Sequence, residues 1–265
     1  MAWWGKLIGG AFGFMLGGPL GALIGAALGH NLDRGVAGFA SGAVLGAGET
    51  ERVQTAFFTT IFSVMGHMAK ADGRVTHEEL NIARSLMSHM QLSEEQRKAA
   101  MNLFGEGKKA GFPLNEVLDQ FKQECRGRRN LVQMFLEMLI STALADGVMH
   151  AAERDLLQYI SEKLGFSRAV FEQLLSLIQA QQQYAGSTAS GKTPAETLNE
   201  AYAVLGVSES ENDAEVKKAY RRLMNEHHPD KLVSKGLPEE MMKLATEKTQ
   251  EIKQAYEQIK KARAN

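Results

Sequence analysis

The side chains whose types and spacing could support a chemical function lie near the C-terminus, in His228-Pro229-Asp230. Pro229 has no amide proton and disfavours helical geometry at the residue before it, so the helical pattern that precedes the tripeptide should end here. The resulting corner would expose one imidazole and one carboxylate.

Two helical patterns should position this corner. The first begins at Asn212-Asp213, whose side chains can accept hydrogen bonds from the free amides of a helix start. It carries an apolar stripe at helical spacing. Its other side is basic, with Lys217, Lys218, Arg221 and Arg222. The second pattern covers about residues 238–260. Two such helices joined by a loop should form an antiparallel hairpin, whose open side residues 198–207 would close.

The C-terminal segment resembles the J domain, the module that drives Hsp70 chaperones. The resemblance covers about residues 196–262 and rests on blocks that occur in order at the right spacing. These blocks are Ala201-Tyr202-x-x-Leu205-Gly206-Val207, Val216-Lys217-x-Ala219-Tyr220-Arg221, His228-Pro229-Asp230-Lys231 and Glu251-Ile252-x-x-Ala255-Tyr256. The tripeptide alone could be a chance helix stop, but the full set argues against that interpretation. The resemblance implies that the tripeptide docks on the Hsp70 ATPase domain, while the basic helix steers the approach to an acidic surface.

Composition excludes several other classes of function. A net charge of −1 over 265 residues argues against binding nucleic acid along the whole chain. The single cysteine, Cys125, excludes an intramolecular disulfide framework and paired-cysteine zinc sites. The basic cluster 126–129 lacks interleaved aromatic residues, so we interpret it as a solvated helix junction, with lipid headgroups as the alternative contact. There is no nucleophile–base pair and no glycine-rich phosphate loop, so we expect neither an enzyme nor a cofactor.

The N-terminus predicts a membrane anchor over residues 1–34. No charged residue occurs from Leu7 to Leu32, which is longer than the roughly 20 residues that a spanning helix needs. Trp3 and Trp4 precede this run, where an interfacial aromatic anchor belongs. The run is too long for the apolar part of a cleaved signal peptide. A single span followed by a juxtamembrane glycine-rich segment, residues 35–51, is expected, and a two-helix hairpin turning near residues 30–33 is the alternative.

Glycine recurs at every fourth residue through the predicted span, from Gly5 to Gly29. At this spacing the glycines line one helix face, where two backbones can approach closely. The repeated GxxxG pattern predicts a parallel homodimer through this face, with its centre at Gly9, Gly13, Gly17, Gly21 and Gly25.

Residues 52–182 predict a series of amphipathic helices with an internal repeat. A helix followed by an Asp-Gly turn occurs at Asp72-Gly73 and again at Asp146-Gly147, 74 residues later. The segment resembles the TerB-like all-helical fold named for tellurite-resistance proteins, which implies carboxylates at these turns as metal ligands. The candidates are Asp72, Glu79, Asp146 and Glu153. Each copy offers only two carboxylates, whereas hard cations take six or more oxygens. We therefore favour a structural role, in which Asp caps the turn, Gly supplies a left-handed backbone and Glu begins the next helix.

The order of segments completes an all-α interpretation. Residues 183–195 are polar and small, so they predict a flexible linker before a J domain at residues 196–265. This order resembles a family of bacterial inner-membrane co-chaperones of DnaK, the bacterial Hsp70. The resemblance implies stimulation of the DnaK ATPase, a link to envelope signalling and capsule control, a short periplasmic N-terminus and cytoplasmic C-terminal domains. Two alternatives stay open: a metal or stress sensor with the J domain as its output, and a membrane scaffold with a degenerate J domain.

Overall fold

The structure is a computed structural model that describes residues 18–25, 48–70, 87, 90, 92–145, 147, 149–187 and 194–264. Every regular element in these ranges is helical, which confirms the predicted all-α class. The central domain contains α3 (Glu49–Met68), α5 (Glu94–Gly107), α6 (Leu114–Glu124), α7 (Arg129–Ala143), α8 (Ala151–Lys163) and α9 (Arg168–Ser187). The C-terminal domain contains α10 (Pro194–Leu205), α11 (Asp213–His227), α12 (Pro229–Ser234), the short 3-10 helix η2 (Glu239–Met241) and α13 (Met242–Arg263).

An aromatic cluster joins three helices of the central domain. Phe57 of α3, Phe121 of α6 and Phe135 of α7 are fully buried, and their ring centroids lie 4.5–6.0 Å apart. Edge-to-face contacts at such distances stabilise a core beyond simple area burial. The two helices of the predicted repeat, α3 and α7, therefore meet through the contact between Phe57 and Phe135.

Helices α3 and α5 approach each other at two glycines. A Cβ atom on Gly66 would lie 2.0 Å from the carbonyl oxygen of Phe104, and one on Gly107 would lie 1.8 Å from that of Ser63. Real Cβ atoms do not come so close to a backbone oxygen, so only glycine allows this spacing. Helices α3 and α5 are thus in close backbone contact at both glycines.

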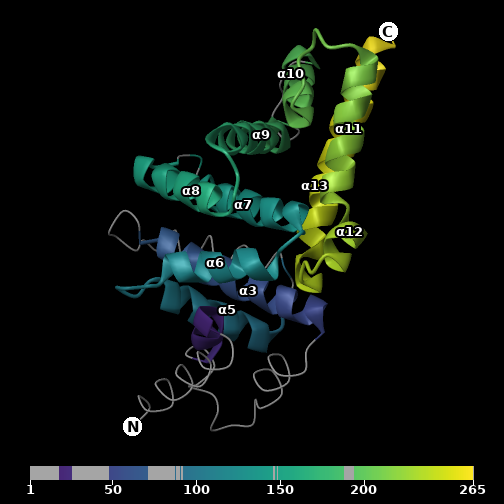
Figure 1. The fold of residues 1–265 in the computed structure, drawn as a ribbon. Coiled ribbons are helices and arrows are strands. Elements are labelled where there is room, and N and C mark those ends of the chain that lie inside the picture. The colour runs from purple at the N-terminus through teal and green to yellow at the C-terminus, as the bar shows by residue number, and fades with distance from the viewer. Residues whose placement is uncertain are drawn as a thin grey trace.

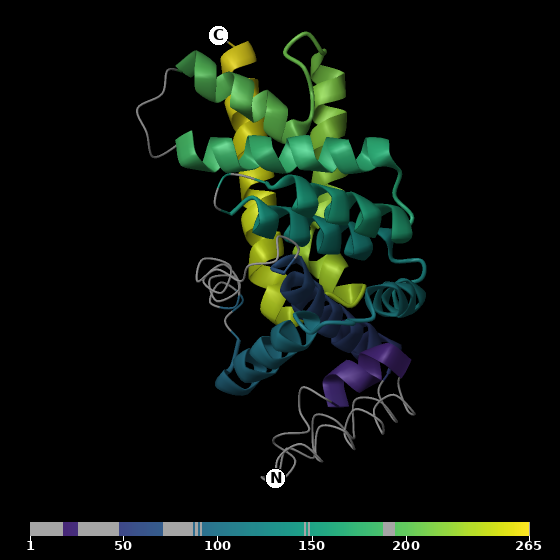
Figure 2. The same ribbon diagram turned by 90° about the vertical axis from the view of Figure 1, so that its left-hand side faces the viewer.

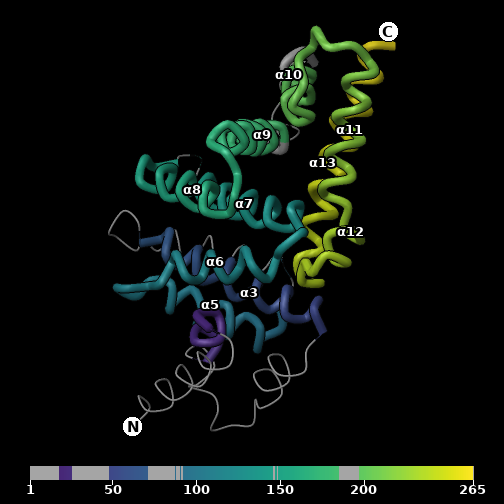
Figure 3. The backbone as a smooth tube through the Cα atoms, in the orientation of Figure 1, coloured from purple at the N-terminus to yellow at the C-terminus, as the bar shows by residue number. Residues whose placement is uncertain are grey.

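The C-terminal domain is the predicted helical hairpin. Helices α11 and α13 run antiparallel and side by side, and α10 packs across their far end (Figures 1 and 3). The hairpin has its own core, which includes Ala201, Tyr202, Val204, Leu205, Val216, Leu223, Ile252, Ala255 and Ile259. Tyr220 stacks on Tyr256 between the two long helices at 4.2 Å. The expected second helix, residues 238–260, is observed as η2 followed by α13.

The hairpin lies against the central domain, and its axis runs across those of α7, α8 and α9 (Figures 1 and 2). The apolar core of the central domain continues into it through Leu232, Leu237, Met241 and Ala245. Helix α9 continues to Ser187 and α10 begins at Pro194, so both ends of the stretch expected as linker are helical. Residues 188–193 lie outside the described residues. Since the two domains share a buried core, the C-terminal domain is seated on the central one in this structure.

Residues 18–25 are the described part of the predicted membrane span. They form a helix whose Leu20 and Leu23 are buried against the central domain. The amide of Leu20 donates a hydrogen bond to Oε1 of Gln120 on α6, at 2.8 Å. None of the helices within the described ranges is both long and apolar enough to cross a membrane.

The glycines of the predicted dimer face are described only in part. Gly21 is buried and Gly25 is half-buried in the helix of residues 18–25. Gly9, Gly13 and Gly17 lie outside the described residues, so the homodimer stays a prediction.

Candidate functional site

The predicted helix stop lies at the expected residue. Helix α11 ends at His227, and His228 leaves the helical region with φ −59° and ψ 123°. Pro229 then occupies the first turn of α12, where its missing amide proton costs nothing and its fixed φ favours a helix start. The carbonyl of His228 accepts a hydrogen bond from the amide of Leu232 at 3.0 Å. The corner is therefore a direct helix-to-helix joint, although the sequence predicted a loop between two helices.

The side chains of the corner are accessible in part. Asp230 is exposed, and within the described residues its carboxylate makes no ion pair. His228 is half-buried, and its buried Nδ1 atom has no hydrogen-bond partner among the described residues. Lys231 Nζ donates to Oδ1 of Asn225 and so bridges the last turn of α11 to the first turn of α12. The bridge holds the corner closed while the carboxylate of Asp230 stays exposed.

The basic face of α11 leads directly to this corner. Lys217, Lys218, Arg221 and Arg222 are all exposed. Arg222 lies 3.6 Å from Glu226, and within the described part of the chain the other three make no ion pair. Uncompensated cations in a row attract an acidic surface over distances of about one Debye length, roughly 8 Å in physiological salt. The structure thus places both predicted groups of binding residues, the tripeptide and the basic face, next to each other.

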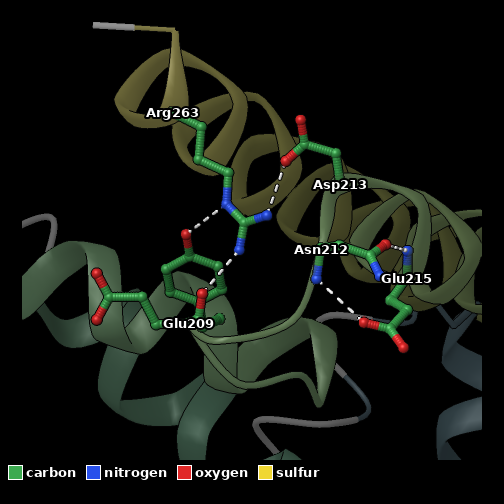
Figure 4. Close-up of polar contacts among 6 residues, drawn as sticks. Glu209, Asn212, Asp213, Glu215 and Arg263 are labelled. Carbon is green, nitrogen blue, oxygen red and sulfur yellow. Dashed lines mark hydrogen bonds and ion pairs between the residues drawn. The ribbon is translucent and has the colours of Figure 1, made fainter.

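A polar cluster at the opposite end ties the hairpin together (Figure 4). The guanidinium of Arg263, at the end of α13, donates to Asp213 at 2.7 Å, to the hydroxyl of Tyr202 at 2.8 Å and to the carbonyl of Glu209 at 3.0 Å. The predicted cap is also present: the side chain of Asn212 accepts from the amide of Glu215, and the carboxylate of Glu215 accepts from the amide of Asn212, both at 3.0 Å. These contacts fix the register of α11 against α13 and α10, and hence the position of the corner at the other end.

Of the four candidate metal ligands in the central domain, the structure describes only Glu153. Glu153 accepts a hydrogen bond from the amide of His150 at 3.0 Å in the first turn of α8, which confirms the predicted role at the helix start. Gly147 has φ 87°, the left-handed conformation that the turn was expected to need. Asp72, Glu79 and Asp146 lie outside the described residues. Among the residues that are described, no cluster of three His, Cys, Asp or Glu side chains could hold a metal ion.

A buried charged cluster lies behind the corner, and the sequence did not predict it. Glu137 of α7 lies 3.4 Å from Nζ of Lys248 on α13 and 3.6 Å from Nδ1 of His227, the last residue of α11. Its other oxygen accepts from Gln133 at 2.9 Å, and Lys248 also donates to Gln181 of α9. The available signal was a single charged residue, Glu137, within the mostly apolar run of α7 from Leu131 to Ile140.

Burial decides the charge state of this cluster. Desolvation lowers the pKa of His227, outweighing the opposite effect of Glu137, so the imidazole is neutral at pH 7. Burial acts to raise the pKa of Glu137, but the facing His227 and Lys248 side chains and the bond from Gln133 outweigh it, and the net shift is downward. Because His227 is neutral, Lys248 is the cation that balances this carboxylate. Burial also raises the pKa of Glu226, on the neighbouring turn of α11.

Comparison with known families divides the chain into the same three parts. The family model for the transmembrane domain of the co-chaperone DjlA matches residues 1–47, that for the tellurite resistance protein TerB matches residues 59–176, and that for the DnaJ domain matches residues 200–264. The first match assigns the membrane segment to residues that the structure largely leaves undescribed. No solved structure matches the chain.

Curated relatives extend the similarity over the whole chain. The co-chaperone protein DjlA of Photobacterium profundum is 47% identical over 272 residues, which cover 97% of this chain and 98% of the relative. The proteins of the same name from Vibrio cholerae and Escherichia coli K12 are 48% and 45% identical, and each comparison covers at least 97% of both chains. At this identity and coverage, the chain belongs to the DjlA family of J-domain co-chaperones with an N-terminal transmembrane domain.

Proposed function

We propose that the protein binds DnaK through the corner His228-Pro229-Asp230 and the basic face of α11, and that binding stimulates the DnaK ATPase. A J domain implies an Hsp70 partner, and the bacterial relatives make DnaK the Hsp70 to test first. One observation carries the proposal: the exposed Asp230 and the half-buried His228 directly adjoin the row of exposed cations on α11.

The mechanism is regulatory. The corner would bind the hydrolysis-competent state of DnaK more tightly than its resting state, and this difference in binding free energy shifts DnaK towards hydrolysis. The basic face raises the association rate by attracting an acidic surface, whereas the corner determines which state is favoured. In this mechanism the chain contributes binding energy, and DnaK contributes the residues that act on ATP.

A steady-state ATPase assay with DnaK and the full-length protein in detergent micelles tests the proposal. We expect His228→Gln to abolish stimulation, because the variant replaces the imidazole while leaving the helix stop at Pro229 in place. Its circular dichroism and thermal midpoint should match those of the unchanged protein, since His228 contributes little to the buried core. A folded His228→Gln variant that stimulates DnaK fully would rule out the proposed binding site.

The membrane arrangement is part of the same proposal. A single span in the inner membrane, with a short periplasmic N-terminus, would place the J domain in the cytoplasm, where DnaK and ATP are present. The glycine face would join two such spans, because small residues let helices approach closely in lipid. Replacement of both Gly17 and Gly21 by Leu should reduce self-association of residues 1–47 in a bacterial membrane two-hybrid assay. Undiminished association would exclude dimerisation through this face.

We further propose that the recruited DnaK acts on envelope signalling and capsule synthesis. The support is the similarity of domain order to inner-membrane co-chaperones. A capsule-gene reporter should respond to overproduction of the protein and should not respond to equal amounts of the His228→Gln variant. Equal responses to the unchanged protein and to the variant would show that any effect on the capsule does not depend on DnaK.

A further inference from the structure

The contact between the two domains includes the residues directly before and after the corner. His227 immediately precedes the corner and is 2% exposed, with its ring against Glu137 of the central domain. After the corner, Leu232, Leu237 and Met241 enter the core of the central domain. The central domain therefore holds the chain on both sides of the tripeptide, within a few residues in each direction.

A second contact shows how closely the domains fit. Gly236 follows α12 with φ 98°, and a Cβ atom there would lie 2.5 Å from a side-chain carbon of Val53 on α3. Only a glycine backbone can lie so near to Val53. Gln96 of α5 also donates a hydrogen bond to Glu240 of η2. Helices α3, α5 and α7 together therefore form the surface of the central domain that contacts the J domain. We call this surface the seat, and a J domain in contact with it seated.

The cluster of Glu137, Lys248 and His227 between the domains is not the arrangement expected from stability alone, which would favour apolar side chains there. Glu137 is 2% exposed, its Oε2 atom has no hydrogen-bond partner, and neither do the two ring nitrogens of His227. An apolar pair at such a buried position is often as stable as an ion pair or more so, because two charges need not lose their hydration. Removal of only one partner is costly, because it leaves the other charge buried and uncompensated. A buried charge pair between domains consequently selects one arrangement of those domains over others.

The J domain contacts the central domain through one face and is proposed to bind DnaK through another. Asp230 and the four basic side chains of α11 stay exposed, while His227 is buried in the seat and Lys248 is half-buried there. The seated J domain can thus present its DnaK-binding residues without first leaving the central domain. Seating and DnaK binding are compatible, so the seat can support the corner during binding.

We propose that Glu137 of the TerB-like domain is a positioning residue for DnaK stimulation: through Lys248 and His227 it seats the J domain on the central domain and holds the corner in its binding geometry. The inference rests on the proposed function and adds a role for the central domain. If the seated form is the one that binds DnaK well, the apparent affinity falls in proportion to the fraction of molecules that are seated.

Seating can be measured without DnaK, in the full-length protein in detergent micelles. Lys98 on α5 and Lys243 on α13 are exposed and lie close in sequence to Gln96 and Glu240, which are in contact. Spin labels on cysteines at these two positions should give one short, narrow distance distribution. Cys125 is buried, and burial raises its pKa to about 12, so it should stay unlabelled.

Glu137→Ala should broaden this distribution towards longer distances, because the half-buried Lys248 is left without its counter-ion. The same variant should raise the concentration of the protein that gives half-maximal DnaK stimulation at least about fivefold, with the maximal stimulation unchanged. Glu95→Ala, which removes an exposed carboxylate of the same domain, is the matched control and should change neither quantity.

A double variant separates positioning from folding. Replacement of both Glu137 and Lys248 by Met removes the buried charges together, so seating and the half-maximal concentration should return to those of the unchanged protein. Three results would overturn the proposal: an unchanged distance distribution in Glu137→Ala, altered seating with an unchanged half-maximal concentration, or a double variant as defective as the single one. If the unchanged protein does not stimulate DnaK at all, the proposed function fails, while the distance measurement still reports on seating.

Discussion

The close approach of α3 and α5 leads to a prediction whose size follows from the geometry. A Cβ atom on Gly66 would lie 2.0 Å from the carbonyl oxygen of Phe104, and carbon–oxygen contacts are normally at least about 3.3 Å. Gly66→Ala must therefore move the two helices apart by about 1.3 Å. Because the obstructing atom belongs to the backbone, no side chain can turn aside to reduce this movement.

Overpacking of this kind costs about 3 kcal/mol, the upper part of the usual range. The higher helix propensity of alanine offsets about 1 kcal/mol of that loss. Gly66→Ala should thus destabilise the central domain by about 2 kcal/mol, which lowers the midpoint of thermal unfolding by roughly 4–8 °C for a domain of this size.

A matched glycine on the partner helix should respond in the opposite direction. A Cβ atom on Gly105 of α5 meets nothing within 4 Å. Gly105→Ala should therefore gain the helix propensity alone, about 1 kcal/mol, and raise the unfolding midpoint by roughly 2–4 °C. Far-ultraviolet circular dichroism of the full-length variants on heating measures both values. Equal stability of Gly66→Ala and the unchanged protein, or equal losses in the two variants, would refute the argument from helix spacing.

Three further predictions concern charge and reactivity. Lys217→Ala combined with Arg221→Ala should weaken DnaK binding more at low salt than at high salt, because the ions screen an exposed field; equal losses at both would exclude electrostatic steering. Seating should weaken as the pH falls below 6.5, since burial lowers the pKa of His227 in the seated form and the released imidazole takes up a proton more readily. The distance between the two spin labels, measured from pH 8 to pH 5.5, tests this prediction. In a His227→Leu variant the distance should no longer depend on pH. The charged groups that act on His227 are Glu137, Lys248 and Arg222. The preceding residue, Glu226, opposes the trend, because burial raises its pKa and its protonation therefore favours the seated form. Cys125 should react with a thiol reagent only on unfolding, because burial raises its pKa to about 12 and keeps it as the thiol; rapid labelling of the folded protein would contradict its burial.

Local physics explains the features that were predicted correctly. Proline at position 229 forbids continuation of α11 whatever surrounds it, so the corner could be placed from three residues. Asn212 caps α11 through contacts within its own first turn, and Gly147 takes a left-handed backbone within its own turn. Each of these features depends on residues that are near one another in sequence.

Features that depend on distant residues were missed or only partly predicted. The helical pattern of α7 showed that Glu137 would lie among apolar neighbours, but not that Lys248, 111 residues later, would balance its charge. The polar composition of residues 183–195 indicated a linker, yet α9 extends to Ser187 because Tyr184 is buried in the hairpin core and donates to Gln258. In both places the outcome depends on a contact with the other domain.

The amino-acid sequence by itself determined the class of each segment and the position of the exposed tripeptide, because periodicity, proline and glycine act over a few neighbouring residues. Only the tertiary structure decided that the J domain rests on the TerB-like domain, with Glu137 and Lys248 facing each other behind the corner. An apolar stripe states that a helix face must be buried, but many partners could bury it equally well. Which one does so depends on the packing of whole domains, including the close backbone approach at Gly236 that no short pattern specifies.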